Sequence, residues 1–528
     1  MPKQVFIIGI GGTGMRCIES FVHLCAMGMF DDTNVHMLAL DTDRENGNFT
    51  RLKDLKEAYL KTKGVNKIHS ALKNTFFSAN LTYYQYSPDY SKKSNFDAIF
   101  DYDSIKIRNS DEKAIADLLL TESAKTFDLK HGYRAQTHLG SMLMYHSIID
   151  DVKTNTKGDL RRFIQELITA STAGRPRIFI LGSVFGGTGA SSIPIIPRAM
   201  KKAAAYISSA TDIEKNAFFG SILLTSYFAF NIPNEDERTR QKLIATHDKF
   251  SLNSQAAMMF YEADDTVKQT YQKFYMMGTE NLDWKPSKFK DKTVTGGEDQ
   301  ENDSHYIELL AAFAAYDFFN LPELELKQLK DDKELVYQYR TFDNGGKIEF
   351  TDFIDSEKKE ELAKKFGMFT AMSYLVLLDK YDLFGKAQNG DLKKVNIEGY
   401  EDIDLEEVKN LKTYMGLYHF RIQNSVIKDG WLRQLHHSAG SEDKFLFNSG
   451  LFSAKNIQQL EKFAFNNSIY QKNSDFESKK FRSGVLGLSS IWNDFFAEFI
   501  KIPEPDVTNN CEKLIKRTYD TLCKIYKF

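Results

Sequence analysis

Two glycine-rich segments carry the residue types and spacing in this sequence that best suit chemistry. Residues 9–14 read Gly-Ile-Gly-Gly-Thr-Gly, and residues 183–192 read Ser-Val-Phe-Gly-Gly-Thr-Gly-Ala-Ser-Ser. Each segment follows a short apolar run and precedes a helical pattern. Glycine lets the backbone approach a phosphate closely, and the first turn of a helix offers amide donors and a favourable dipole. The sequence therefore predicts two phosphate-binding turns.

The two turns would serve one ligand if their strands were neighbours in a parallel sheet, because both sets of amides would then face one polyphosphate. A nucleotide with three adjacent phosphates explains both turns at once. Hydroxyl groups at Thr188, Ser191 and Ser192 would add donors or reach a water molecule bound to Mg²⁺. Neither turn is followed by Gly-Lys-Ser or Gly-Lys-Thr, so the P-loop pattern is absent and the backbone would hold the phosphates.

A dinucleotide is the alternative ligand. Gly9, Gly11 and Gly14 match the dinucleotide-binding fingerprint, with Asp41 after the second strand as the partner of the ribose. This interpretation predicts an oxidoreductase that uses NAD or FAD, and it leaves the second turn unexplained. The simplest alternative is a tight glycine turn that binds nothing.

Apolar runs indicate the elements that position these turns. Runs rich in β-branched or aromatic residues predict strands at residues 5–10, 35–40, 177–181 and 218–225, and further strands at 96–100 and 274–277. A helical stripe occupies residues 15–29, between the first two strands. This alternation predicts an α/β fold with a doubly wound parallel sheet.

The rest of the chain predicts a different organisation. Polar stretches at residues 279–304 and 327–347 flank a strongly apolar segment at 306–319, which is typical of a buried helix between loops. Helical patterns dominate beyond residue 355. We therefore expect a nucleotide-binding α/β domain at residues 1–300, a central helix and loop at 301–350, and a helix-rich C-terminal domain at 351–528.

The composition of the chain limits the kinds of partner and compartment that we expect. The 528 residues carry a net charge of −3, whereas a general nucleic-acid binder carries a broad basic surface. Four scattered cysteines favour neither a disulfide framework nor a zinc cluster. No secretory signal and no transmembrane segment are expected from the apolar patterning. The sequence thus predicts a cytoplasmic protein.

The order of these motifs resembles the tubulin and FtsZ superfamily of GTP-binding cytoskeletal proteins, and above all its divergent bacterial tubulin-like group. The superfamily signature Gly-Gly-Gly-Thr-Gly-Ser/Thr-Gly is similar to Phe-Gly-Gly-Thr-Gly-Ala-Ser at residues 185–191, although the first and last glycines differ. Asp41-Thr42-Asp43 resembles the Asn-Thr-Asp that closes the second strand of FtsZ. The likeness covers roughly residues 3–360.

The resemblance implies a set of nucleotide-binding residues. The segment 132–140 falls at the γ-phosphate loop, Asn253 at the residue that reads guanine, and Asp303 near the ribose or base. The full expected set is Gly11, Gly12, Thr13, Gly14, Asp41, Asp43, Arg134, Gln136, Gly186, Gly187, Thr188, Gly189, Ser191, Asn253 and Asp303.

Hydrolysis in this superfamily uses acidic residues of a loop that act on the nucleotide of the next subunit. Two stretches compete for this role. Asp352 and Asp355 have the expected spacing and follow the apolar helix, and they are the preferred catalytic pair. Asp303 and Glu308 precede that helix, where they would more naturally cap its N-terminus.

The resemblance therefore implies a GTPase that uses GTP or GDP with Mg²⁺ and assembles with copies of itself, head to tail, into filaments. Two alternatives stay open, namely the dinucleotide-dependent oxidoreductase and a non-catalytic nucleotide-binding scaffold. The missing signature residues favour the scaffold somewhat. Nucleic acid is not an expected partner.

Overall fold

A parallel sheet forms the centre of the molecule. The computed structural model describes residues 3–64, 72–102, 104, 110–129, 133, 136–208, 213–229, 249–279, 284–286, 297–298, 300–342, 356–377, 405–423, 426–438, 498–507 and 510–526. Within them, seven strands follow the order β3-β2-β1-β4-β5-β6-β7, and every neighbouring pair is parallel. The strands are β1 (Lys3–Ile10), β2 (Thr33–Leu40), β3 (Asn80–Tyr86), β4 (Arg177–Ser183), β5 (Phe218–Leu224), β6 (Tyr271–Thr279) and β7 (Val336–Phe342).

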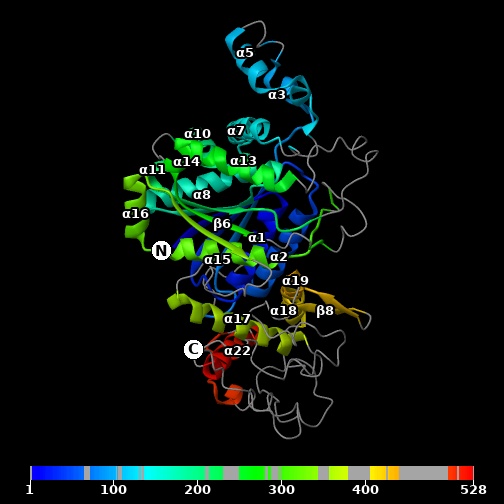
Figure 1. Ribbon diagram of the computed structural model, residues 1–528. Helices are drawn as coiled ribbons and strands as arrows, with labels where there is room; N and C mark the ends of the chain where they lie inside the picture. Colours follow the sequence, from blue (N-terminus) through cyan, green and yellow to red (C-terminus); the bar gives the residue numbers. More distant parts are fainter. Residues whose placement is uncertain are drawn as a thin grey trace.

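Helices cover both faces of the sheet, which confirms the predicted doubly wound α/β fold (Figure 1). One face carries α1 (Gly11–Ala26), α2 (Gly47–Lys63) and α15 (Tyr306–Asn320). The other carries α7 (Thr137–Thr154), α8 (Asp159–Ala173), α9 (Gly187–Ser192), α10 (Ile196–Ala204), α11 (Ile213–Asn216), α13 (Phe250–Ala263) and α14 (Asp265–Thr270). Central strands such as β5 are buried on both faces, which explains their continuous apolar sequences.

Helix α15 is the predicted central helix. It packs against α1 and against strands β4, β5 and β6, and it also touches α19 (Trp431–Ser438). All of its residues except Asp317 and Asn320 are buried, so no polar face interrupts its apolar sequence. A helix that is apolar all round belongs in the interior of a large domain.

Two of the predicted elements were wrong. Residues 96–100 form a helix, α3 (Phe96–Phe100), because the Asn95 side chain accepts a hydrogen bond of 2.8 Å from the Ala98 amide and caps it. The third strand is instead β3. The polar stretch 327–347, expected to be a loop, contains the end of α16 (Glu323–Asp332) and the edge strand β7. An edge strand with exposed side chains lacks the apolar run on which strand prediction depends.

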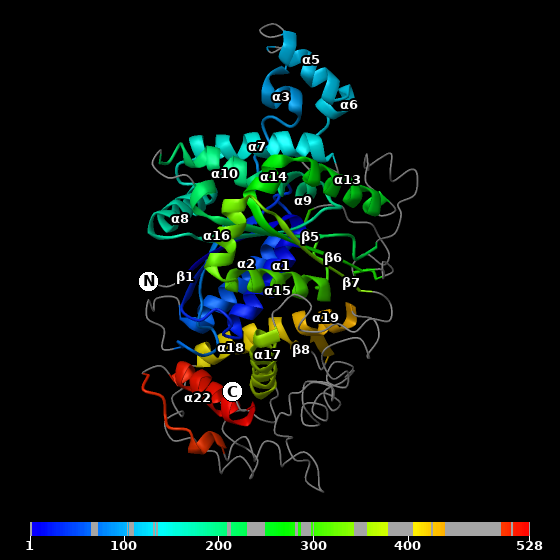
Figure 2. The same ribbon diagram turned by 60° about the vertical axis from the view of Figure 1, so that its left-hand side comes forward.

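Helices α3, α5 (Ser110–Leu119) and α6 (Glu122–Lys125) project beyond α7, away from the sheet (Figures 1 and 2). They lie within the segment that separates the two glycine turns along the chain. This projection is therefore an addition to the α/β core, and it leaves the sheet order intact.

The C-terminal part is helix-rich, as predicted. Its described residues form α17 (Ser356–Leu377), α18 (Leu405–Tyr418), the antiparallel hairpin β8 (Phe420–Gln423) and β9 (Val426–Asp429), α19, and α22 (Asn510–Tyr526). These elements lie at the opposite end from α5 (Figure 2). Its buried side chains join one apolar cluster with α1, α2 and α15. The domain boundaries at residues 300 and 350 stay predictions. No helix in the described part of the chain is both long and apolar enough to cross a membrane.

Candidate functional site

The two glycine turns lie side by side at the carboxyl ends of two central strands of the sheet. Strand β1 pairs with β4, with Ile7 opposite Phe179 and Gly9 opposite Leu181, and the strand order reverses between these two strands. Because neighbouring parallel strands end on the same side of a sheet, the turn after β1 and the turn after β4 lie next to each other at the carboxyl ends of these strands. Ligands of open α/β sheets bind at this switch point.

Gly11 and Thr188 mark where the turns approach each other. A Cβ atom built on Gly11 would lie 3.9 Å from the Cβ of Thr188, and nothing else is within 4 Å of it. Gly11 has a φ of +67°, a left-handed conformation that favours glycine. By contrast, a Cβ on Gly14 would lie 2.4 Å from the carbonyl oxygen of Leu181. Gly14 thus permits close packing of helix on strand, whereas Gly11 is the point of the first turn that approaches Thr188 of the second.

Side chains after β2 tie the turns together. The Thr188 hydroxyl lies 3.1 Å from the Thr42 hydroxyl and donates a bond of 3.3 Å to Oδ1 of Asp41. The same oxygen accepts a bond of 2.7 Å from the Thr42 amide, and Oδ2 accepts one of 2.7 Å from Nδ2 of Asn46. Both carboxylate oxygens of Asp41 are therefore engaged by the protein itself.

Burial changes the acidity of this carboxyl group. Asp41 is 5 % exposed, and its pKa rises to about 6 because burial disfavours the charged form and the nearby Asp43 carboxylate repels it. Hydrogen bonds from Asn46, Thr42 and the Asp43 amide oppose this rise. Asp41 consequently changes its charge close to neutral pH.

A segment before α15 that includes Gly297 and Gln300, called the strap here, contacts residues that follow β2. The amide of Gly297 donates a bond of 2.6 Å to Oδ2 of Asp43, and Nδ2 of Asn48 donates one of 2.8 Å to the carbonyl oxygen of Gln300. Asn46 accepts from the Asn48 amide at 3.0 Å and thereby caps α2. Sequence reasoning missed Asn46, Asn48 and Gln300. The available signal was a pair of asparagines in the loop after the strand predicted at residues 35–40.

The second turn has an accessible part and a buried part. Gly186, Gly187 and Thr188 are half-buried, whereas Gly189 and Ser191 are buried. The Ser191 hydroxyl donates a bond of 3.1 Å to the carbonyl oxygen of Thr188, within its own turn. A Cβ on Gly189 would lie 2.3 Å from the carbonyl oxygen of Ser183. Ser191 and Gly189 thus shape the turn, and Gly186 to Thr188 form its accessible part.

The described end of the expected γ-phosphate segment, from Gln136 to Gly140, leads into a helix that lies beside the second turn. Gln136 directly precedes α7, and Ser141 in the first turns of that helix donates a bond of 2.8 Å to the carbonyl oxygen of Ser191. A Cβ on Gly140 would lie 2.8 Å from the Cβ of Ser191. Arg134 lies outside the described residues.

Asn253, the expected guanine reader, lies against the same turn. Its Nδ2 donates a bond of 3.4 Å to the carbonyl oxygen of Phe185, and it is half-buried. The Phe185 ring packs 4.7 Å from that of Phe250 and 5.7 Å from that of Phe228, measured between centroids. This aromatic cluster holds α13 against the second turn.

One of the two acidic stretches, Asp303 to Glu308, lies at the start of α15, and its Glu308 has a structural role. Glu308 is fully buried; its Oε1 accepts bonds of 2.6 Å from Nε of Arg16 and from the Tyr227 hydroxyl. Its Oε2 accepts from the His305 amide at 3.0 Å and completes a capping box. The predicted capping role of Glu308 is confirmed. Asp303 is half-buried, and Asp352 and Asp355 lie outside the described residues.

Among the described residues, no group of three or more His, Cys, Asp or Glu side chains has the geometry to hold a metal ion.

Comparisons with known proteins give a weak likeness. No family model matches the chain, and no curated protein matches it. Among solved structures, it is similar to TubZ of Clostridium botulinum phage c-st, in a form with a truncated C-terminal tail, at 14 % identity and a TM-score of 0.25. The match covers 68 % of this chain and 74 % of that one. A TM-score this low does not assign a family.

Proposed function

We propose that the chain binds GTP or GDP at the switch point and is a tubulin-like or FtsZ-like GTPase. One observation carries this proposal: two glycine turns from neighbouring strands face each other across Gly11 and Thr188. Backbone amides of residues 11–13 and 186–188 would converge on one polyphosphate, which needs no lysine.

A dinucleotide fits the site less well. The strand order also occurs in dinucleotide-binding folds, so the sheet alone does not choose between them. Asp41 makes the difference, because a dinucleotide enzyme needs this carboxylate for the ribose hydroxyls. Here its oxygens accept from Thr42, Asn46 and Thr188, and the side chain is buried. This observation favours the polyphosphate.

The residues around the turns would have distinct tasks. Asp41 would fix the Thr188 hydroxyl at the mouth of the second turn, and Asp43 would hold the strap through Gly297. Asn253 would meet the guanine base, and Gln136 and Arg134 would approach the terminal phosphate. Mg²⁺ would neutralise charge on the phosphates when bound.

Hydrolysis would be completed by a second copy of the chain. Asp352 and Asp355 of that copy would position the attacking water, since phosphoryl transfer depends on alignment and charge stabilisation rather than on a covalent intermediate. Head-to-tail contacts of this kind generate filaments when they do not close into a ring. The commitment of Glu308 to Arg16 supports the choice of Asp352 and Asp355 over the earlier acidic pair. We also propose that the protein acts in the cytoplasm.

Nucleotide identification tests the proposal. The protein is purified under native conditions and denatured, and the released nucleotide is identified. GTP or GDP supports the proposal, whereas NAD or FAD replaces it with the oxidoreductase. A protein that carries no nucleotide and does not bind added GTP contradicts it.

Turnover distinguishes the GTPase from a non-catalytic scaffold. Catalysis in trans rises faster than linearly with protein concentration, and Asp352→Ala should remove turnover while GTP binding persists. A protein that binds GTP without hydrolysing it at any concentration is a scaffold.

A further inference from the structure

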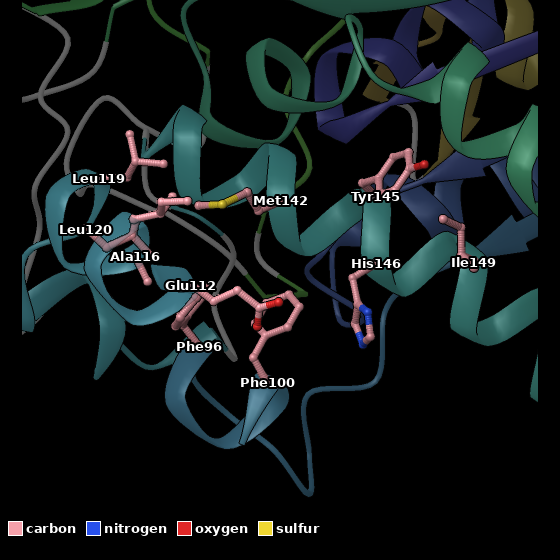
Figure 3. Close-up of a pocket in the computed structure, with 11 residues that line it drawn as sticks. Phe96, Phe100, Glu112, Ala116, Leu119, Leu120, Met142, Tyr145, His146 and Ile149 are labelled. Carbon is pink, nitrogen blue, oxygen red and sulfur yellow. The ribbon is translucent and has the colours of Figure 1, made fainter. Parts of the chain in front are cut away.

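An apolar pocket of about 420 Å³ lies where α3 and α5 meet α7. Figure 3 shows its lining side chains, with Met142 of α7 extending toward Leu120. Among the lining residues, Phe96 and Leu120 are buried, whereas Ile115 and Leu119 are each 58 % exposed. Exposed apolar side chains that join into one continuous patch mark an interaction surface, whereas ones that stand singly do not.

The pocket has the shape of a groove between two helices. On α5 it is lined by Glu112, Ile115, Ala116 and Leu119, which follow the spacing i, i+3, i+4, i+7. On α7 it is lined by Met142, Tyr145, His146 and Ile149, which follow the same spacing. Two facing helical stripes suit a third helix laid between them, whose own apolar residues would recur at that spacing.

The surroundings of this groove are acidic. Helices α3, α5 and α6 carry five acidic residues against two basic ones, namely Asp97, Asp111, Glu112, Asp117 and Glu122 against Lys113 and Lys125. On α7, the exposed Asp150 directly follows Ile149. A complementary partner therefore carries lysine or arginine beside its apolar stripe.

We propose that the groove formed by α3, α5 and α7 binds a basic amphipathic helix of another protein. Charge argues against two other occupants. Two copies of this chain joined through the same patch would bring like charges together, because such an interface is self-complementary. An anionic membrane surface would repel the acidic helices. The proposal does not depend on nucleotide binding at the glycine turns.

A synthetic peptide tests the proposal directly. The probe is a fluorescent peptide of leucine and lysine, about 18 residues or roughly five helical turns long, with leucines at i, i+3, i+4 and i+7. Binding to the full chain is followed by fluorescence anisotropy. We expect binding that weakens as salt rises, and no comparable binding of a peptide with the same composition whose leucines are spread around the helix.

Two variants and a matched control locate the binding site. Ile115→Gln and Leu119→Gln each place a polar group in the groove, and each should weaken peptide binding roughly tenfold. Leu118→Gln is the control, because Leu118 lies on the same helix, is 84 % exposed and does not line the groove. It should bind the peptide as the wild type does. All three positions are exposed, and circular dichroism checks that each variant folds.

Several results would overturn the proposal. The groove is not the site if the two peptides bind equally, or if Leu118→Gln weakens binding as much as Ile115→Gln. If sedimentation shows that the wild type self-associates and that Ile115→Gln makes it monomeric, a second copy is the occupant. Binding of the wild type to anionic vesicles that Leu119→Gln abolishes would assign the groove to a membrane.

Discussion

The Nε atom of Arg16 donates a hydrogen bond of 2.6 Å to Oε1 of Glu308, a residue 292 positions later in the chain. Both side chains are buried, and the Tyr227 hydroxyl bonds to each of them. Arg16 lies one turn after the first glycine turn, and Glu308 lies in the first turn of α15. This ion pair thus fixes α1, the helix that begins at the first glycine turn, to the central helix.

Removing Glu308 should strongly destabilise the protein. Glu308→Ala leaves the Arg16 charge buried without its partner, which costs about 3 to 5 kcal/mol. Urea denaturation of the ligand-free protein measures this loss. The double variant with Arg16→Met and Glu308→Leu should recover most of it, because no buried charge is left. A single variant that loses under about 1 kcal/mol would show that the pair is not buried in solution.

Gly186 offers a substitution that tests nucleotide binding without harming the fold. Gly186 has φ −94° and ψ 161°, which alanine also adopts, and a Cβ there would meet only the Ser183 hydroxyl, at 3.4 Å. Gly186→Ala should therefore fold normally yet crowd a phosphate, and weaken GTP binding at least about tenfold, measured by calorimetry.

Gly174 supplies the control for this substitution. It lies before β4, at the opposite end of that strand from the second turn, and a Cβ there meets nothing within 4 Å. Gly174→Ala should bind GTP like the wild type. Normal GTP binding by Gly186→Ala would remove the second turn from the site.

The titration of Asp41 predicts how stability depends on pH. Its folded-state pKa is raised to about 6, so between about pH 4 and pH 6 the folded protein holds a proton that the unfolded chain has released. The free energy of unfolding therefore falls as the pH rises through this window, by up to about 3 kcal/mol from this group. Asp41→Asn removes this dependence.

Urea denaturation of the wild type and Asp41→Asn at about pH 4 and pH 7 measures the difference between them. The wild type should become less stable relative to the variant as the pH rises. A difference that stays constant across this range would mean that Asp41 titrates as an ordinary exposed carboxyl group.

Substitutions at two helix caps should have the same effect on stability but different effects on GTP binding. Asn46 caps α2 and also contacts Asp41, whereas Asn95 caps α3 in the projecting helices. Replacing either residue with alanine should cost about 1 kcal/mol of stability. Only Asn46→Ala should also weaken GTP binding, because it releases Asp41 beside the turns. If the two variants bind GTP equally well, the contact between Asn46 and Asp41 does not contribute to GTP binding.

Local patterns predicted much of the sheet and failed in two identifiable places. Strands β1, β2, β4 and β5 are continuous apolar runs, because helices cover both of their faces. Residues 96–100 resemble such a run, but the Asn95 cap makes them a helix. Strand β7 at the edge has mostly exposed side chains and hence no apolar signal.

The sequence by itself determined the two glycine turns and the helices that follow them, because a turn's conformation depends on residues adjacent in the chain. The tertiary structure decided that Gly11 meets Thr188 and that Asp41 bonds to Thr188 rather than facing outward. It also decided that Glu308 pairs with Arg16 instead of standing free as an acid. These contacts join residues more than a hundred positions apart, and only the strand order brings them together.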